Sequence, residues 1–445
     1  MNKLLIKNAT IINENKRSLK DIYIEGEYIK EINTHIDLDD EVETINAKGL
    51  LVIPGMIDDQ VHFREPGLTH KGDISSESMA AVAGGVTSYI EMPNTFPNTT
   101  SINEFNKKIE TASTKSFANF SFMFGGTNDN ISEIKKINKS EVAGVKLFLG
   151  SSTGKMLIDN LSAIENIFNS TKLPISAHCE DEQTIRDNTN YYKNIYGEDI
   201  PVELHPKIRS DKACLKSSEF AVKLAKKTGA KLNVFHISTA KELKLFDNKI
   251  DIKNKKITAE VCAHHLWFTD DDYKKLGSKI KWNPAIKSQT DKDELWKALK
   301  EDKIDIIASD HAPHTEEEKN NKYLNCPSGG PMVQHTILSI LQNCENYGVK
   351  IEKIVEKIAH NPAIIFQINK RGFLREGYYA DIVLIDTNTP TFVTKDSLFY
   401  KCGWSPFEGQ KFDNSIYKTI LNGRVVYSDG KVKPLPIGKK LTFNR

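Results

Sequence analysis

The segment IASDHAPHTEEEK, residues 307–319, places a carboxylate and two imidazoles directly after an apolar run. A short apolar run bounded by polar residues is typical of a buried strand. Carboxylate oxygen and imidazole nitrogen bind zinc and similar divalent ions, and a catalytic site keeps one position for water. Asp310 at the end of this run therefore predicts a metal-dependent hydrolase. His311 alternates to the opposite side, so we do not expect it to be a ligand.

Other ligand-type residues end further apolar runs of the same kind. Gln60 and His62 are two residues apart in MIDDQVHF, so their side chains point to the same side of a strand. The remaining candidates are Lys146 in GVKLFLG, His178 in PISAHCE and His236 in LNVFHIS. One such histidine alone is usually a core residue hydrogen-bonded to the backbone, but several at successive strand ends indicate one shared site.

The runs that carry these residues predict the fold. Eight strand-like runs alternate with helix-length amphipathic segments such as SSEFAVKLAKKTG between residues 53 and 369. This rhythm predicts an α/β fold, a closed parallel (β/α)8 barrel of the TIM type, with its active site at the carboxyl ends of the strands. An open doubly wound sheet is the alternative, and it is disfavoured because no Gly-rich dinucleotide fingerprint follows any of the eight runs.

The two ends of the chain have a different pattern. Residues 1–52 show short alternating runs such as LLIKNATII, broken by Asn, Gly and charged turns, and the pattern returns in GYYADIVLIDT and RVVYSDGKV within residues 370–445. Such runs suit small antiparallel strands. We therefore expect the two segments to form one small, discontinuous, sandwich-like β domain beside the barrel.

Composition excludes several classes of partner. The 445 residues include 61 basic and 59 acidic side chains, for a net charge of +2, so nothing indicates nucleic acid or a membrane as a partner. The first residues lack the apolar core of a signal peptide, and no window approaches the ~20 apolar residues of a spanning helix. The six cysteines form no C-x-x-C pair, and we expect a cytoplasmic protein without disulfides.

Several motifs together resemble those of the amidohydrolase superfamily, and within its cyclic amidase branch those of the dihydroorotase family. They are PGMIDDQVHFREPGLTHKGD, IEMPNT, GVKLF, AHCED, HIST and SDHAPHTEEEK, with a trailing GYYADIVLID. The resemblance runs through the whole predicted barrel. It implies the reversible, zinc-dependent cyclisation of N-carbamoyl-L-aspartate to dihydroorotate, with loss of water, in pyrimidine (UMP) biosynthesis.

The resemblance also implies a metal centre. A carboxylated Lys146 would bridge two ions, one held with His178 and His236 and the other with His62 and Asp310. The family pattern has H-x-H at the end of the first strand, and here Gln60 replaces the first histidine. A neutral amide oxygen is a weaker zinc ligand than imidazole. We therefore expect one firmly held zinc and leave the second ion open.

Substrate contacts follow from the same resemblance. Arg64 offers a planar, bidentate grip on a substrate carboxylate, and its alternative is a structural salt bridge with a neighbour such as Glu65. The other residues implied to bind substrate are Asn94, Asn283, His314 and Gly329. In the implied mechanism a metal-bound hydroxide attacks the ring amide, and Asp310 takes its proton and later passes it to the amide nitrogen.

Two other functions remain open. The first is another cyclic amidase, an allantoinase or a dihydropyrimidinase, whose substrates carry no carboxylate at the place expected for Arg64. The second is a non-catalytic dihydroorotase-like scaffold for aspartate carbamoyltransferase, which only Gln60 supports. The resemblance is compatible with a homodimer and with association with that carbamoyltransferase. Cys179 and Cys262 alternate away from the neighbouring candidates, so we expect both to be packing residues.

Overall fold

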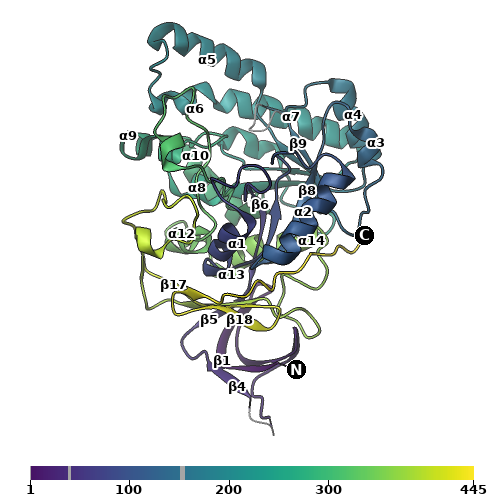
Figure 1. The fold of residues 1–445 in the computed structure, drawn as a ribbon, viewed down its shortest axis with the longest axis vertical. Helices are drawn as coiled ribbons and strands as arrows, with labels where there is room; N and C mark the ends of the chain where they lie inside the picture. The colour runs from purple at the N-terminus through teal and green to yellow at the C-terminus, as the bar shows by residue number, and fades with distance from the viewer. Residues whose placement is uncertain (1, 39–41, 151–155) are drawn as a thin grey trace.

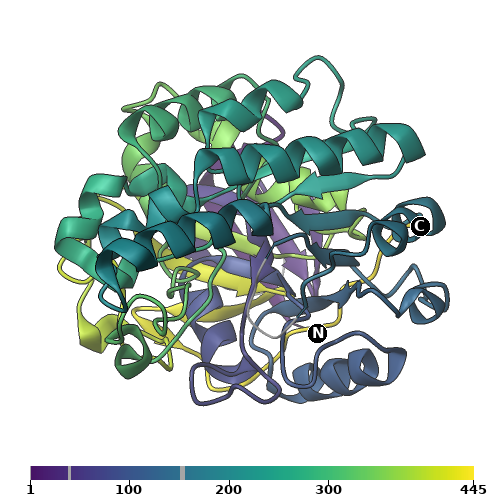
Figure 2. The ribbon, with the colours of Figure 1, turned by 90° about the horizontal axis from the view of Figure 1, so that it is seen from above.

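Eight parallel strands form the centre of the protein in a computed structural model that describes residues 2–38, 42–150 and 156–445. Each strand pairs with the next one along the chain (Figures 1 and 2). They are β6 (Met56–Val61), β7 (Val86–Glu91), β8 (Asn119–Gly125), β9 (Gly144–Phe148), β10 (Ile175–His178), β11 (Leu232–Val234), β12 (Ile257–Cys262) and β13 (Ile306–Ala308). A parallel bridge between Val61 and His311 joins the last strand to the first, so the predicted barrel is confirmed.

Helices lie around these strands, as the view from above shows (Figure 2). They are α1 (Ile74–Ala83), α2 (Ile102–Lys115), α3 (Ile131–Ile134), α4 (Leu161–Ser170), α5 (Glu182–Tyr196), α6 (His205–Ile208), α7 (Asp211–Thr228), α8 (Ala263–Trp267), α9 (Tyr273–Leu276), α10 (Gln289–Lys300), α11 (Glu316–Lys319), α12 (Thr336–Cys344), α13 (Ile351–Val355) and α14 (Asn361–Ile365). A π-helical turn, Glu356–His360, joins the last two. Their apolar faces and the outer faces of the strands form one continuous core.

Local sequence signals explain where the helices that follow the site strands begin. The Asp181 side chain accepts a hydrogen bond from Thr184 N at the start of α5, and the Ser210 side chain caps α7 in the same way. Such caps satisfy backbone N–H groups that have no partner inside the helix. The chain therefore leaves β10 at His178 and turns into a helix within a few residues, which holds His178 at the strand's carboxyl end.

A second sheet lies below the barrel in Figure 1 and is built from both ends of the chain. Its order is β19-β18-β17-β14-β5-β1-β2-β3, with β4 also on β1. The strands are β1 (Lys3–Asn13), β2 (Lys16–Glu25), β3 (Tyr28–Asn33), β4 (Glu43–Asn46), β5 (Leu51–Pro54), β14 (Ile382–Asp386), β17 (Ser415–Leu421), β18 (Arg424–Ser428) and β19 (Lys431–Val432). The predicted joining of the two ends is confirmed. The expectation of purely antiparallel pairing is wrong, because β4 and β5 pair with β1 in parallel.

One part of the C-terminal segment packs on the barrel instead of on this sheet. The short hairpin of β15 (Thr391–Phe392) and β16 (Lys411–Phe412) brings Phe412 to within 5.6 Å of the Trp267 ring of α8, centroid to centroid. The domain boundaries 1–52, 53–369 and 370–445 stay a prediction. Within the described part of the chain, no helix combines the length and the apolar character that crossing a membrane requires.

Candidate active site

A small cavity of about 50 Å³ opens among the carboxyl ends of the barrel strands. Of the residues predicted for the site, all but His314 line it. The lining residues are Gln60, His62, Arg64, Asn94, Lys146, Phe148, His178, His236, Trp282, Asn283, Asp310, Ala312, Ser328 and Gly329. The barrel thus brings together residues that are far apart in the sequence: Gln60 and Gly329 are separated by 269 positions. Their individual roles stay predictions.

Lys146, His178 and His236 lie on or just after three neighbouring strands, and all three line the cavity. His178 Nδ1 lies 2.9 Å from His236 Nε2. Lys146 Nζ and His236 Nδ1 are buried and have no hydrogen-bond partner among the described residues. Burial holds the pKa of His236 well below its ordinary value, and the nearby His178 adds to this effect, so the ring is neutral at pH 7. Two neutral imidazoles and a buried amine that has no hydrogen-bond partner are suited to binding one divalent ion, provided that the amine is carboxylated.

The opposite nitrogen of His178 has a carboxylate beside it. His178 Nε2 lies 3.0 Å from Glu180 Oε2, and the same oxygen pairs with the Arg209 guanidinium. Burial opposes ionisation of Glu180, but Arg209 and His178 lower its pKa to about 2. A carboxylate in this position fixes the ring of a metal-binding histidine. Sequence analysis did not predict Arg209, which follows α6 in the middle of a long connection.

On the opposite side of the cavity, His62 and Asp310 face each other. His62 Nε2 lies 3.3 Å from Asp310 Oδ1, and His62 Nδ1 lies 2.8 Å from Asn94 Oδ1. The Gln60 amide nitrogen donates to the same Asp310 oxygen at 3.2 Å. Asn94, predicted to bind substrate, therefore also orients His62.

Two groups in the site have pKa values displaced towards neutrality. Burial raises the pKa of Asp310 to about 7, although Lys146 works against this. Burial likewise lowers the pKa of Lys146 to about 8, although the Glu260 carboxylate opposes it. A carboxyl group that changes charge near pH 7, such as that of Asp310, is suited to proton transfer. An amine with a lowered pKa, such as that of Lys146, is more readily available as the free amine.

Three site residues have a backbone conformation that non-glycine residues rarely adopt. Arg64, His236 and Asp310 have φ angles of 73°, 42° and 45°. Positive φ costs a residue with a Cβ on the order of 1 kcal/mol, and such residues cluster where the surrounding structure fixes a functional side chain. These three strained residues are all predicted site residues, and each of them follows a different barrel strand.

Arg64 lies in the cavity wall and is 2 % exposed. Its Nε donates to Pro313 O at 3.0 Å, and its Nη2 lies 3.1 Å from His314 Nε2. Among the described residues no carboxylate forms a salt bridge with it, and Glu65, the suspected partner, pairs with Lys115 instead. His314 is buried and does not line the cavity, and its predicted contact with substrate stays a prediction.

Another part of the cavity wall is made of backbone that buried lysines hold in place. Lys319 Nζ donates to Pro327 O and Gly329 O, both at 2.9 Å, and Lys281 Nζ donates to Tyr323 O at 2.8 Å. Gly329 has a φ of +127°, and a Cβ there would lie 2.5 Å from Ala312 O, so only glycine fits. This explains the predicted importance of Gly329 as part of a close-fitting wall.

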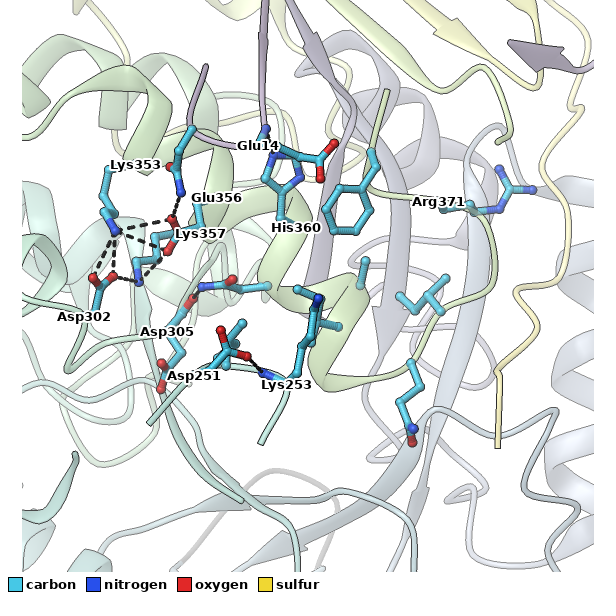
Figure 3. Close-up of a pocket in the computed structure, with 18 of the residues that line it drawn as sticks. Glu14, Asp251, Lys253, Asp302, Asp305, Lys353, Glu356, Lys357, His360 and Arg371 are labelled. Carbon is cyan, nitrogen blue, oxygen red and sulfur yellow. Dashed lines mark hydrogen bonds and ion pairs between the residues drawn. The ribbon is translucent and has the colours of Figure 1, made fainter. Parts of the chain in front are cut away.

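A larger cavity of about 810 Å³ lies at the other end of the barrel, beside the small sheet (Figure 3). Many of its charged residues pair with one another: Lys353 and Lys357 both donate to Asp302, at 2.8 and 2.7 Å. His360 is satisfied by Glu14 N and Gly372 O. The amino ends of barrel strands usually serve stability, and these internal pairs agree with that role.

Comparison with known proteins places the chain in a family. The model of the amidohydrolase family matches residues 51–426. This chain belongs to the amidohydrolase family. Its membership agrees with the strand-end site described above, since that family model spans every residue that lines the cavity.

Relatives of this amidohydrolase have different names. It is 31% identical to a dihydroorotase of Methanosarcina mazei, over 97% of this chain and 95% of the relative. It is 30% identical to an allantoinase of Desulfitobacterium hafniense, over 98% of each. Among solved structures, the L-hydantoinase (dihydropyrimidinase) of Arthrobacter aurescens superposes with a TM-score of 0.94 at 25% identity, covering 99% of this chain and 100% of that one.

Three lining residues, Phe148, Trp282 and Ala312, were not assigned a site role from the sequence, whereas Ser328 was expected beside Gly329 in the backbone-lined wall. Phe148 and Trp282 are both aromatic. Residues of this type are common in barrel cores, so their type alone did not indicate a site. Position alone could have found Phe148, since it lies two residues after Lys146 and so points to the same side of β9.

Proposed function

We propose that this amidohydrolase is a dihydroorotase, which interconverts N-carbamoyl-L-aspartate and dihydroorotate by closing and opening a cyclic amide. The observation that carries the proposal is Arg64, a buried guanidinium that faces the cavity without a carboxylate partner in the described chain. A buried charge without a partner is costly, so the cavity favours an anionic ligand. Dihydroorotate carries a carboxylate, whereas hydantoin and allantoin are neutral.

Other lining residues complement the ring of this substrate. Asn283 Oδ1 is buried and has no hydrogen-bond partner in the described chain, so it can accept a bond from a ring N–H. Arg64 would hold the carboxylate through two parallel N–H bonds. The wall at Gly329 would lie flat against the ring, because no side chain projects there.

Lys146, His178 and His236 would hold the divalent ion, which we propose is zinc, with Lys146 carboxylated. The bound ion supplies an acidified water and polarises the amide carbonyl. Burial favours the free amine of Lys146, the form that reacts with carbon dioxide. Glu180 would keep the ring of His178 oriented through its Nε2.

Asp310 would move the proton. Its carboxylate lies beside His62 and Gln60 at the cavity surface, and its raised pKa makes it a competent base near pH 7. In ring opening it takes a proton from water and delivers it to the departing amide nitrogen. In ring closure the same carboxyl group carries the proton in the reverse direction.

The deciding experiment is the interconversion of carbamoyl aspartate and dihydroorotate by the purified protein with zinc supplied. Hydantoin, dihydrouracil and allantoin are assayed beside them. Turnover of dihydroorotate with the highest kcat/KM supports the proposal. Faster opening of allantoin or hydantoin would assign the chain to another cyclic amidase. Absence of turnover on all substrates by metal-loaded protein would favour the scaffold for aspartate carbamoyltransferase.

A further inference from the structure

Gln60 lies where the cavity meets the barrel interior and is 2 % exposed. Its amide nitrogen donates to Asp310 Oδ1 at 3.2 Å, and its amide oxygen lies 3.8 Å from Cys262 Sγ. Cys262 is fully buried and does not line the cavity, so it packs behind Gln60. The Gln60 carboxamide lies between Cys262 of β12 and Asp310, which comes two residues after β13. Its nitrogen faces Asp310 and its oxygen faces Cys262.

We propose that this chain binds a single divalent ion, through Lys146, His178 and His236, and that Gln60 positions Asp310 by a hydrogen bond instead of binding a second ion. The proposal rests on the proposed function only in taking Asp310 as the proton carrier. It concerns how many ions the site holds, which does not depend on the identity of the cyclic amide.

The orientation of the carboxamide argues against an ion between Gln60 and Asp310. An N–H donor directed at Asp310 occupies the side of the carboxylate from which a cation would approach. Turning the amide over would place its oxygen against a carboxylate oxygen and its N–H₂ against a thiol, which is a weak acceptor. The observed orientation is therefore the one that satisfies both ends.

The two halves of the site differ in what they offer an ion. On the Lys146 side, the buried Lys146 Nζ has no hydrogen-bond partner in the described chain, and His178 Nδ1 and His236 Nε2 face each other at 2.9 Å. On the Gln60 side, both ring nitrogens of His62 and the Oδ1 atom of Asp310 already have partners: His62 contacts Asn94 and Asp310, and Gln60 donates to Asp310 Oδ1. Unpaired buried donors favour a ligand, whereas a satisfied network gains less from one.

The hydrogen bond from Gln60 orients the Asp310 carboxylate. The backbone of Asp310 is held in its positive-φ conformation, and its carbonyl accepts from Trp282 Nε1 at 3.3 Å. These contacts fix the main chain but leave rotation of the carboxylate to its own partners. Gln60 and His62 are the two side chains within reach of Oδ1, so Gln60 fixes the direction from which the carboxylate meets water.

The test counts metal in four purified proteins: wild type, Gln60→Leu, Gln60→His and, as a control for nonspecific binding, Gln342→His on α12. After equilibration with zinc and exhaustive dialysis, we expect about one ion per chain in wild type, Gln60→Leu and the control, and about two in Gln60→His. Two ions in wild type, or loss of an ion in Gln60→Leu, would overturn the single-ion proposal.

The positioning role is tested by kinetics with the same variants. Gln60→Leu keeps the size of the side chain but lacks the N–H, so kcat should fall by about 10-fold or more while KM stays nearly constant. Gln60→Met, which has a similar length but no N–H to donate, should not restore kcat. An unchanged kcat in Gln60→Leu would overturn the positioning role. A wild-type protein with one ion that fails to turn over dihydroorotate would refute the proposed function and leave the metal count standing.

Discussion

Asp310 is the residue on which the proposed chemistry depends most directly. Replacing it by asparagine keeps its shape and its hydrogen bond from Gln60 but removes the basic carboxylate. We predict that Asp310→Asn lowers kcat by about 10²- to 10⁴-fold, the usual range for loss of a general acid–base group. Steady-state kinetics measure the loss, and far-UV circular dichroism checks the fold. A folded variant with wild-type kcat would exclude the role.

Arg64 should decide between charged and neutral substrates. We predict that Arg64→Met weakens transition-state binding of dihydroorotate by about 2–4 kcal/mol, or roughly 30- to 1000-fold in kcat/KM, because a buried carboxylate loses its charged partner. Dihydrouracil has the same ring without the carboxylate and should show little change. Arg64→Lys, which keeps the charge but loses the planar fork, should lie between the two. Equal losses for both substrates would refute the carboxylate contact.

At this scale the sequence allowed most of the cavity lining to be predicted, because strand ends converge in a barrel and ligand-type residues stand out there. Arg209 and Lys319 could not be predicted in the same way. Each reaches the site through contacts set by long connections, Arg209 by its pair with Glu180 and Lys319 by backbone carbonyls. No residue type or spacing in the sequence specifies such contacts.

Among the elements, the connection between β10 and α5 carries a charge whose effect on stability depends on pH. The pKa of Glu180 is about 2 in the folded protein, against 4.5 for an ordinary glutamate, despite its burial. Because the folded pKa is lowered, the ionised carboxylate stabilises the protein above about pH 4.5, and this contribution is lost as pH falls towards 2. A shift of this size corresponds to about 3 kcal/mol.

We therefore predict that Glu180→Gln lowers the free energy of unfolding by about 3 kcal/mol at pH 7, with a smaller difference at lower pH. Urea unfolding of metal-free protein at several pH values provides the measurement. Glu182→Gln is a suitable control, because Glu182 lies on the exposed side of α5 and pairs with Arg186 near the surface. A Glu180→Gln effect that does not vary with pH would mean that packing, not charge, accounts for it.

Of the two buried lysines beside the wall formed by residues 327–329, Lys319 is the one that donates to the wall itself. Lys319 donates to two carbonyls of this wall, at Pro327 and Gly329, from the end of α11. We predict that Lys319→Met costs about 2–4 kcal/mol in unfolding free energy, since buried carbonyls lose their donor, and also raises KM. Lys322→Met is the matched control, because the carboxylate with which Lys322 pairs, that of Asp199, is exposed. Equal effects of the two changes would show that Lys319 does not organise the wall.

For the whole molecule, alternation of strand-like and helical segments was enough to predict the barrel and the joining of the two chain ends. Closure of the barrel was predicted with it, and the parallel bridge between Val61 and His311 provides that closure. The parallel pairing of β4 and β5 with β1 was missed. Short alternating runs indicate strands but leave the direction of their partners unspecified.

The junction between the barrel and the small sheet contains a buried ion pair that should hold the two together. Asp381, which immediately precedes β14, pairs with Arg371 and accepts from Asn119 Nδ2 of barrel strand β8 at 3.2 Å. Both members of the ion pair are buried. Removing one leaves an uncompensated charge, so we predict that Asp381→Ala lowers the free energy of unfolding by about 3–5 kcal/mol.

Denaturant unfolding, followed by tryptophan fluorescence and by circular dichroism, measures this loss. Asp271→Ala serves as the control, because its pair with Lys274 is exposed and should contribute less than about 1 kcal/mol. Since the pair connects the sheet with β8, the two probes should still report a single transition in wild type, whereas Asp381→Ala should separate them. Coincident transitions and a loss no larger than that of the control would show that the sheet and the barrel are held together without this pair.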